Sequence, residues 1–279
     1  MGLTYQPRWE SLFSVKSHRQ GGLNPCATDP PEQRLRTDLS RDELELFRNN
    51  GYLKLPVTLP SDTVFELRDT ILRDVQDAVE PVVRDDRGHV VRISQVWNRG
   101  GIFQQVLAYD RVLDCLESVL SPNIVLTLNR HNHCTLRTAG AGGEGWWHRD
   151  VSHWTRTVVS VLFYLDDAPL ERGCTHVVPG SHRLRYAPRG AEGVGAFEDE
   201  GIMRQSVPVP CQSGDMLLIN GLILHCLGKN LTDKTRMSMT AGYHDVDELY
   251  GMSNDKCVLV RGEPVYEGND PSAKGRHAP

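Results

Sequence analysis

Hydrophobic residues in the first part of the chain recur at helical spacing. Ser40 is followed three positions later by Glu43, an apolar stretch comes next, and Gly51 ends it, which is the pattern of a capped helix. Two further stretches, from Ser61 to about Ala78 and from Phe103 to Leu120, place apolar residues three or four positions apart. We therefore expect the first half of the chain to be rich in helices.

From Ile124 onward the pattern changes to short runs that alternate or are continuously apolar, separated by Gly and Pro. Examples are IVLTLNRHNHCTL, TVVSVLFYLDD, DMLLING and RMSMTAGYH. Such runs are typical of strands, and no internal repeat accompanies them. The sequence predicts a mainly β chain with flanking helices, in which the strands build a barrel or jelly roll.

The ends of the chain lack any period. We expect residues 1–37 to form a loosely ordered arm, 266–279 a tail, and 38–265 a single catalytic domain. Residues 183–205 are rich in Gly and charge, and they predict either a lid over a pocket or an ordinary surface insertion. The arm, this segment and helices around Val91 to Gly101 would together shape a pocket for a small organic molecule.

Charge and composition narrow the function classes. The net charge of −5 comes from 31 basic and 36 acidic residues, and the basic ones form no stripe, which argues against nucleic acid as a partner. No apolar run is long enough to cross a membrane, and the start of the chain lacks the pattern of a secretory signal, so we expect a cytoplasmic protein. The seven cysteines include no CxxC pair, which favours reduced thiols over disulfides or structural zinc.

Candidate metal ligands lie within the strand-rich half. In the segment WWHRD, His148 and Asp150 are two positions apart, so on a strand both side chains leave the same face. His225, in LILHC, offers a third ligand. Two imidazoles and one carboxylate are the ligand set of non-haem iron(II) oxygenases. An HxD pair alone is weak evidence, because satisfied surface or hinge residues give the same spacing.

A second polar pair follows the last of these histidines. Arg236 and Ser238 again share one face of a strand, within the otherwise apolar run RMSMTAGY. A guanidinium fork with a neighbouring hydroxyl suits a carboxylate, and a buried arginine needs an anion. We interpret the pair as the anchor for the distal carboxylate of 2-oxoglutarate; an ion pair of Arg236 with Asp233 is the alternative.

These residues stand in blocks that resemble the phytanoyl-CoA dioxygenase-like family of iron(II)/2-oxoglutarate-dependent oxygenases. The resemblance extends over LSRDELELFRNNGYLKLP, WWHRD, YLDDAPLERGCTHVVPGSH and SGDMLLINGLILHCLGKNLTDKTRMSMTAGYH. It implies a double-stranded β-helix, the jelly-roll or cupin-like fold, with helices packed along one face. It also implies that His148, Asp150 and His225 bind Fe(II), and that Arg236 with Ser238 binds 2-oxoglutarate.

The family also implies further contacts to the co-substrate. Polar or aromatic residues on the strand before the HxD pair and just after it often serve this purpose, and here His131, Thr135 and Trp154 are the candidates. We expect the side chains of His131 and Thr135 to face inward; for Trp154, packing in the core or at the rim is the alternative. The segment PGSH resembles a structural turn of the family, so His182 is not expected to bind metal.

The resemblance implies the consumption of O2 and 2-oxoglutarate, with release of succinate and carbon dioxide and attack on a C–H bond of a small molecule. We expect hydroxylation; epimerisation, cyclisation or desaturation are alternatives for the same oxidant. Asp150 disfavours halogenation, because halogenating relatives replace this carboxylate. By analogy alone, the substrate would belong to bacterial specialised (antibiotic) metabolism. A cupin-like metalloprotein that does not use 2-oxoglutarate, or a non-catalytic binding relative, are alternatives of another class.

Overall fold

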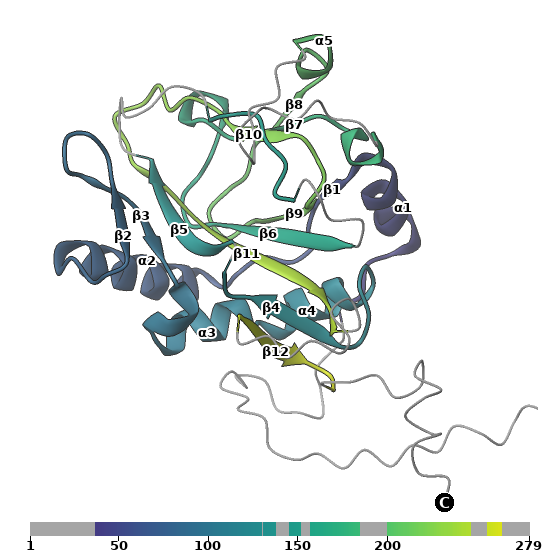
Figure 1. Cartoon of the computed structure of the whole chain (residues 1–279), viewed down its shortest axis with the longest axis horizontal. Helices are drawn as coiled ribbons and strands as arrows, with labels where there is room; N and C mark the ends of the chain where they lie inside the picture. Colours follow the sequence, from purple (N-terminus) through teal and green to yellow (C-terminus); the bar gives the residue numbers. More distant parts are fainter. Residues whose placement is uncertain are drawn as a thin grey trace, which may run out of the picture. The chain divides into compact units, whose positions relative to one another are not determined.

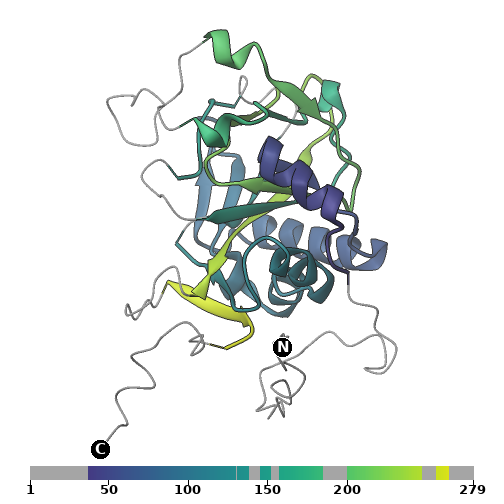
Figure 2. The same ribbon diagram turned by 90° about the vertical axis from the view of Figure 1, so that its right-hand side faces the viewer.

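The chain folds into two antiparallel sheets packed against each other, with helices on the outer face of the larger sheet (Figures 1 and 2). A computed structural model describes residues 37–129, 131–137, 145–151, 157–184, 200–246 and 256–263. All of them belong to one unit of the chain, Leu35–Pro279. This arrangement is the jelly roll that the sequence predicts, so the expected fold class is confirmed.

The elements follow one another in the order helices, then mostly strands. The helices are α1 (Arg41–Asn50), α2 (Ser61–Gln76), α3 (Gly101–Leu107), α4 (Asp110–Glu117) and α5 (Glu200–Met203), with 3-10 turns η1 (Val96–Arg99), η2 (Leu170–Arg172) and η3 (Ser181–Arg183). The strands are β1 (Tyr52–Lys54), β2 (Val82–Arg84), β3 (Val90–Ser94), β4 (Ile124–Thr127), β5 (Asn132–Arg137), β6 (Val158–Tyr164), β7 (Thr175–Val177), β8 (Val207–Val209), β9 (Met216–Asn220), β10 (His225–Leu227), β11 (Arg236–Asp245) and β12 (Cys257–Arg261).

The larger sheet has the order β1-β9-β6-β11-β5-β3-β2, and β4 joins it by pairing with β11 and β12. The smaller sheet is β10-β7-β8. The ten residues of β11 pair with β6 on one side and with β5 and β4 on the other, so β11 is the central strand of the large sheet. Its two faces therefore define what lies inside and outside the jelly roll.

The outer face of the large sheet packs against α2, α3 and α4 and forms the main hydrophobic core. Helix side chains such as Leu67, Phe103 and Leu116 are fully buried there against strand residues such as Met239 and Val161. Continuous burial along β6 follows from this position between two packed layers. The core therefore holds β11 and β6 in place between the helices and the interior of the jelly roll.

A second, smaller apolar cluster fills part of the space between the two sheets. Leu162, Tyr164 and Leu217 from the large sheet contact Val177 and Ile223 from the other side. The remaining inner face of the large sheet, on β3, β5 and β11, is polar, and it lies beside the segment that carries the HxD pair. Apolar packing therefore closes one end of the jelly roll, and the polar end is left for a ligand.

The predicted helices are confirmed with one correction. Ser40 accepts a hydrogen bond from the amide of Glu43 and completes a capping box, and Gly51 ends α1 with a φ of 81°. The helix from Ser61 is α2. The single helix expected over 103–120 is wrong, because Tyr109 adopts an extended conformation and separates α3 from α4. Asp110, an acidic residue in the first turn of the second helix, marks this restart.

The expectation of helices around Val91 to Gly101 is also wrong. Val90–Ser94 is a strand that pairs with β2 and β5, and a 3-10 turn follows it. The apolar run is short, and its partners lie outside the local sequence, so tertiary pairing decides its structure. The resulting β2–β3 hairpin forms one wall of a cavity described below.

Several predicted features fall on parts of the chain that the structure does not describe. These are residues 1–36 of the predicted arm, the tail 266–279, residues 185–199 of the predicted lid, and Trp154. Of the predicted lid, the described part contains α5. Among the described helices, none combines the length and apolar content that crossing a membrane requires.

Candidate metal centre and anion pocket

His148 and His225 lie directly opposite each other in a short antiparallel bridge. The amide of each donates to the carbonyl of the other, at 3.0 and 3.1 Å, and the two ring centroids are 4.3 Å apart. Three residues earlier, the amide of Gly145 donates to the carbonyl of Leu227 at 2.6 Å. A Cβ at Gly145 would stand 2.8 Å from the Leu227 nitrogen, so glycine permits this close approach.

Asp150 completes the cluster. Its Oδ1 lies 3.7 Å from Nε2 of His148 and 3.5 Å from Nε2 of His225, and one ligand atom of each residue lies within 4.8 Å of the other two. Asp150 and His225 are buried, whereas the side chain of His148 is one-third exposed. The structure therefore brings together all three predicted ligands, with one side of the cluster open.

The protonation of both imidazoles suits metal binding. Nδ1 of His148 lies 2.7 Å from the carbonyl of Trp146, and Nδ1 of His225 lies 3.1 Å from the carbonyl of Ile223. A carbonyl only accepts, so each Nδ1 carries the proton and each Nε2 presents a lone pair. Burial lowers the pKa of His225 to about 4, which keeps the imidazole neutral at pH 7. The donor set therefore fits a divalent transition metal such as iron(II).

The carboxylate of Asp150 is fixed from its other side by Ser160 on β6. The Ser160 hydroxyl donates to Oδ2 at 2.6 Å. Burial by itself raises the pKa of Asp150, but the nearby imidazoles of His225 and His131, together with this hydrogen bond, outweigh burial and hold the pKa below its ordinary value. Asp150 is therefore held as a carboxylate, with Oδ1 directed at the imidazoles.

Arg236, at the start of β11, is the largest fully buried side chain among the described residues. Its Nη1 donates to the carbonyl of Gly173, whereas Nε and Nη2 have no hydrogen-bond partner in the described parts of the chain. Burial lowers the pKa of Arg236, with the charges of Arg137 and Arg172 adding to the effect. Each unsatisfied buried donor costs about 1–3 kcal/mol, more for a charged group. The two atoms form a ready fork for a carboxylate.

Two hydroxyls stand beside this guanidinium. Ser238 on β11 is paired directly with Thr135 on β5 on one side and with Tyr164 on β6 on the other. Residues paired across strands share a face, and Arg236 is two positions from Ser238, so all of them belong to the inner face. The Tyr164 hydroxyl is engaged with Thr175 at 2.6 Å. Ser238 and Thr135 therefore lie next to Arg236 on this face.

The strand before the HxD pair also contributes to this inner face. His133, Thr135 and Arg137 are half-buried on the inner face of β5, and the residues between them are buried on the other face. His131, which precedes the strand, has a φ of 46° and brings its Nε2 to 3.3 Å from Oδ1 of Asp150. His131, His148 and Asp150 line one cavity of about 440 Å³. The structure thus places His131 and Thr135 on the inner side, as expected.

His182 lies apart from the cluster. Its Nε2 is 3.1 Å from the carbonyl of Arg48, and a Cβ on Gly51 would stand 2.4 Å from its Nδ1, so the ring packs against the end of α1. This position agrees with the expectation that PGSH forms a turn rather than a ligand.

Sequence reasoning missed Ser160 and two arginines that line the cavities, Arg92 and Arg137. The signal for Ser160 was present: it is the one serine in the apolar run VVSVLFY, and a fully buried hydroxyl needs a partner. The arginines gave no such signal, because charged residues on a strand of unknown register are equally consistent with a solvated face.

The fold and the site define a class: a jelly roll that carries a two-histidine, one-carboxylate cluster beside a buried, partly unsatisfied arginine. A family model described as phytanoyl-CoA dioxygenase (PhyH) matches residues 47–238, more than half of the chain. The chain therefore belongs to the phytanoyl-CoA dioxygenase family.

Individual relatives are more distant. The chain is 28% identical over 112 residues to the dioxygenase sphC of Aspergillus fumigatus, covering 37% of this chain and 28% of that protein. It is 36% identical over 112 residues to phytanoyl-CoA dioxygenase domain-containing protein 1 of Bos taurus, covering 36% of this chain and 38% of the relative. The matches thus span less than half of either relative.

Among solved structures, the epimerase SnoN, in complex with Fe3+, alpha ketoglutarate and nogalamycin RO, has a similar fold. The TM-score is 0.65 at 23% identity, over 79% of this chain and 98% of that one. At this level of identity the likeness supports the jelly-roll fold.

Proposed function

We propose that this chain is an iron(II)- and 2-oxoglutarate-dependent dioxygenase. His148, Asp150 and His225 hold the iron, and Arg236 binds the distal carboxylate of 2-oxoglutarate. The observation that carries the proposal is the pair of unsatisfied buried atoms, Nε and Nη2 of Arg236, on the same inner face as the hydroxyls of Ser238 and Thr135. A buried cation in this state is costly by itself and becomes favourable once a carboxylate occupies its fork.

The iron with its co-substrate and O2 supplies the oxidising power, and the protein supplies position. The bridge between His148 and His225 fixes two imidazoles, and Ser160 fixes the third ligand, Asp150. Arg236, Ser238 and Thr135 orient the co-substrate from its far end. Because geometry then selects the bond that reacts, the site favours attack on one C–H bond of a substrate held in the neighbouring cavity.

We propose hydroxylation as the outcome. Epimerisation, cyclisation and desaturation use the same ligands and remain alternatives; the fold itself occurs in the epimerase SnoN. Halogenation is not expected, because the carboxylate of Asp150 occupies the ligand position at which halogenating relatives lack a carboxylate. The substrate is proposed to be a small organic molecule of specialised metabolism, and the site of action the cytoplasm.

The proposal is tested with manganese(II) in place of iron(II), so that 2-oxoglutarate binds without turnover. Because a ligand that binds the folded state raises Tm, we expect 2-oxoglutarate to stabilise the manganese-loaded protein and not the metal-free protein. Arg236→Gln should abolish this stabilisation. Arg84→Gln is the matched control, since Arg84 is exposed on the β2–β3 hairpin and, among the described residues, its side chain donates only to the carbonyl of Gly88.

The same experiment separates the alternative classes. A cupin-like metalloprotein of another kind would bind manganese but gain no stability from 2-oxoglutarate, with or without Arg236. A non-catalytic relative would bind both and form no succinate with any member of a wide panel of candidate substrates when iron(II) and O2 are supplied. Either result would remove the dioxygenase proposal.

A further inference from the structure

The backbone on either side of Arg236 is held by two charged side chains. On one side, the amide of Met237 donates to Oδ2 of Asp166 at 2.8 Å, in the buried interior. On the other side, the guanidinium of Arg172 donates to the carbonyl of Thr235. The backbone that carries the Arg236 side chain therefore lies between one acceptor and one donor, both supplied by other elements of the fold.

These two side chains also pair with each other. Nη2 of Arg172, the same nitrogen that donates to Thr235, lies 3.7 Å from Oδ1 of Asp166. Asp166 is buried, and its two oxygens have different partners: Oδ2 accepts from the amide of Met237, and Oδ1 faces cations. Asp166 and Arg172 therefore form one connected unit around the start of β11, which we call the Asp166–Arg172 clamp.

The turn that carries Arg172 also contacts the guanidinium of Arg236. Gly173 ends this turn, η2, with a φ of 75°, and its carbonyl accepts from Nη1 of Arg236. A Cβ on Gly173 would collide with the carbonyl of Gly228, so glycine permits the turn to lie here. The turn thus holds both the backbone beside Arg236 and one nitrogen of its side chain, and it leaves Nε and Nη2 for an anion.

Helix α2 contributes a third charged side chain from the outer layer of the fold. Nη1 of Arg68 pairs with Oδ1 of Asp166 and donates to the carbonyl of Leu165 at 2.9 Å. The side chain of Arg68 is one-third exposed, whereas that of Asp166 is buried. The clamp is therefore connected to the surface of the molecule through α2.

A carboxylate is needed at this place because the arginines repel one another. Burial lowers the pKa of Arg68, and the charge of Arg172 lowers it further. Burial also lowers the pKa of Arg236, and Arg172 is among the charges that add to this effect. Among the described residues, Asp166 is the carboxylate that pairs with both Arg68 and Arg172. It therefore stabilises a group of cations of which Arg236 is the one left with donors for a ligand.

We propose that Asp166 is a positioning residue for the co-substrate: acting through the amide of Met237 and through Arg172, it holds Arg236 in the orientation that receives the distal carboxylate of 2-oxoglutarate. The proposal rests on the dioxygenase function proposed above. A guanidinium makes its bidentate contact only when its planar fork meets both oxygens of the carboxylate, so a rotated fork loses much of the binding. Asp166 therefore contributes to the affinity for one end of the co-substrate without contacting it.

The test compares 2-oxoglutarate with 2-oxopentanoate, which has the same carbon chain and a methyl group in place of the distal carboxylate. Isothermal titration gives the Kd of each compound for the manganese(II)-loaded protein. The Kd of 2-oxopentanoate divided by that of 2-oxoglutarate, called the preference ratio below, measures what the distal carboxylate contributes. Arg236→Gln sets the lower limit of this ratio, and we expect the wild type to exceed that limit about tenfold or more, as for loss of a hydrogen bond to a charged group.

Asp166→Leu should lower the preference ratio about tenfold, because Arg236 loses the contacts that orient it. It should leave the Kd values of manganese(II) and of 2-oxopentanoate unchanged, because neither ligand uses Arg236. Asp74→Leu is the matched control: Asp74 is a carboxylate of α2 that pairs with Arg99 at 2.8 Å, so its loss also removes an ion pair but should keep the wild-type ratio. A role limited to stability would change the affinity for both 2-oxo acids alike or for neither.

Arg68→Gln is a milder variant of the same network. Because Arg68 is one-third exposed, its replacement is tolerated more readily than that of Asp166. We expect the preference ratio to fall about two- to fivefold, the scale of a partly exposed ion pair. Arg73→Gln is the matched control on the same helix, where Arg73 is exposed and pairs with Asp69, and it should keep the wild-type ratio.

Two results with Asp166→Leu would overturn the inference: a wild-type preference ratio in a variant that binds manganese(II) normally, and an equal weakening of both 2-oxo acids. If Asp166→Leu yields no folded protein, equal ratios in Arg68→Gln and Arg73→Gln would overturn it. Failure of the dioxygenase proposal is seen separately, in the wild type. A wild-type ratio no higher than that of Arg236→Gln would remove the anchor itself, whatever the Asp166 variant does.

Discussion

Ser160 donates a hydrogen bond of 2.6 Å to Oδ2 of Asp150 from the middle of the fully buried strand β6. The strand is fixed by the main core, so the proposed metal ligand takes its orientation from the most rigid part of the fold. Residues that hold a ligand in this way typically contribute about 10–100-fold to metal affinity.

Ser160→Ala is therefore expected to weaken manganese(II) binding about 10–100-fold, as measured by isothermal titration. Ser94→Ala is the control, because Ser94 lines the same cavity as Asp150, and no hydrogen bond joins the two side chains in the described structure. Equal metal affinity in Ser160→Ala and the wild type would show that Asp150 is positioned without Ser160.

His131 gives a second prediction. Its Nε2 stands 3.3 Å from Oδ1 of Asp150, and its φ of 46° is a conformation that Asn adopts more readily than most residues. His131→Asn therefore removes the imidazole while tolerating the backbone. If His131 contacts the co-substrate, the variant should bind 2-oxoglutarate about tenfold more weakly in the presence of saturating manganese.

His133→Asn is the matched control for that experiment. The His133 ring lies 6.1 Å from the His131 ring and lines the same cavity. Among the described residues, Asp150 pairs with His131 and not with His133. An unchanged affinity for 2-oxoglutarate in His131→Asn, together with weaker metal binding, would instead assign His131 to the support of Asp150.

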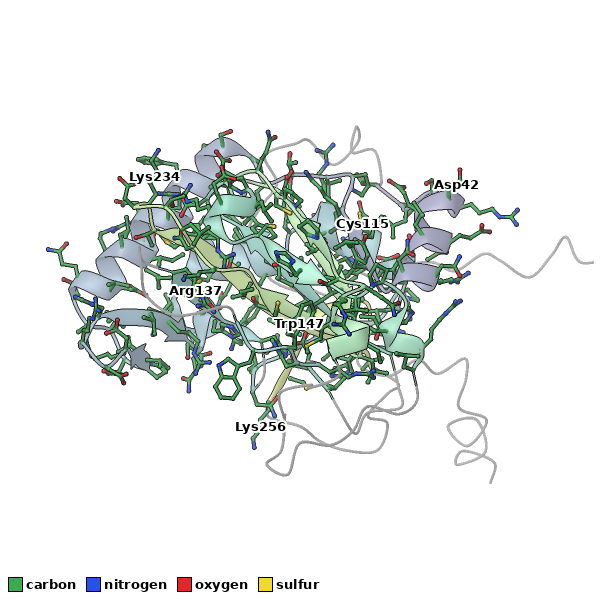
Figure 3. The ribbon with its side chains drawn as sticks, turned by 90° about the horizontal axis from the view of Figure 1, so that it is seen from above. Asp42, Cys115, Arg137, Trp147, Lys234 and Lys256 are labelled. Carbon is green, nitrogen blue, oxygen red and sulfur yellow. The ribbon has the colours of Figure 1, made fainter. Side chains whose placement is uncertain are left out.

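The buried thiols predict how stability depends on pH. Burial, with Asp114 next in effect, raises the pKa of Cys115 from 9.0 to about 12, and burial with Asp215 raises that of Cys211 from 9.0 to about 12. Above pH 9 the unfolded chain loses these protons and the folded chain keeps them, so the unfolded state becomes relatively more favourable. Cys115 packs among the helices (Figure 3).

We therefore expect the Tm to fall as pH rises from 9 toward 12, and to fall less steeply in the double variant Cys115→Ala with Cys211→Ala. Below pH 8 the two thiols are protonated in both states and should contribute no slope. Mass spectrometry after iodoacetamide treatment at pH 8.5 provides a second readout: both cysteines should resist alkylation until urea unfolds the protein. Alkylation in the native state would contradict their burial.

The strands of the jelly roll and the HxD pair were predictable because their signals are local, whereas the addition of His225 to the pair came from the family resemblance. Alternating apolar residues indicate a strand whatever its partner strands are. Because His148 and Asp150 are two positions apart, their side chains leave the same face of a strand in any register. Arg236 with Ser238 follows the same rule. These features needed no knowledge of which strand lies beside which.

What the sequence left open depends on register. That Thr135 stands opposite Ser238, and Arg92 opposite Thr135, follows from strand pairing across more than 100 and about 40 positions of the chain. Strand β3 of the β2–β3 hairpin was misread as helical because it has only five residues and is stabilised by pairing with β2 and β5. The turn of the hairpin, DDRG, is a loop signal that the sequence did contain.

Arg236 offers a prediction that does not depend on turnover. Without a bound anion, its buried guanidinium leaves Nε and Nη2 unsatisfied in the described structure. Replacing even a complete buried ion pair with apolar side chains of similar volume often stabilises a protein by about 1–4 kcal/mol, and an incompletely paired charge contributes less to the fold than such a pair does. Arg236→Met should therefore raise the Tm of the protein in the absence of 2-oxoglutarate, by about 2–4 °C for each kcal/mol gained.

The same variant should lose the response to the co-substrate. With manganese(II) present, 2-oxoglutarate should stabilise the wild type and leave Arg236→Met unchanged, so the order of Tm values reverses as the 2-oxoglutarate concentration increases. Arg99→Met is the control: Arg99 is also buried, but it pairs with Asp74 and donates to three carbonyls, so its replacement should destabilise the protein and preserve the response. A lower Tm for Arg236→Met at every concentration would mean that the fold uses Arg236 for its own stability rather than for an anion.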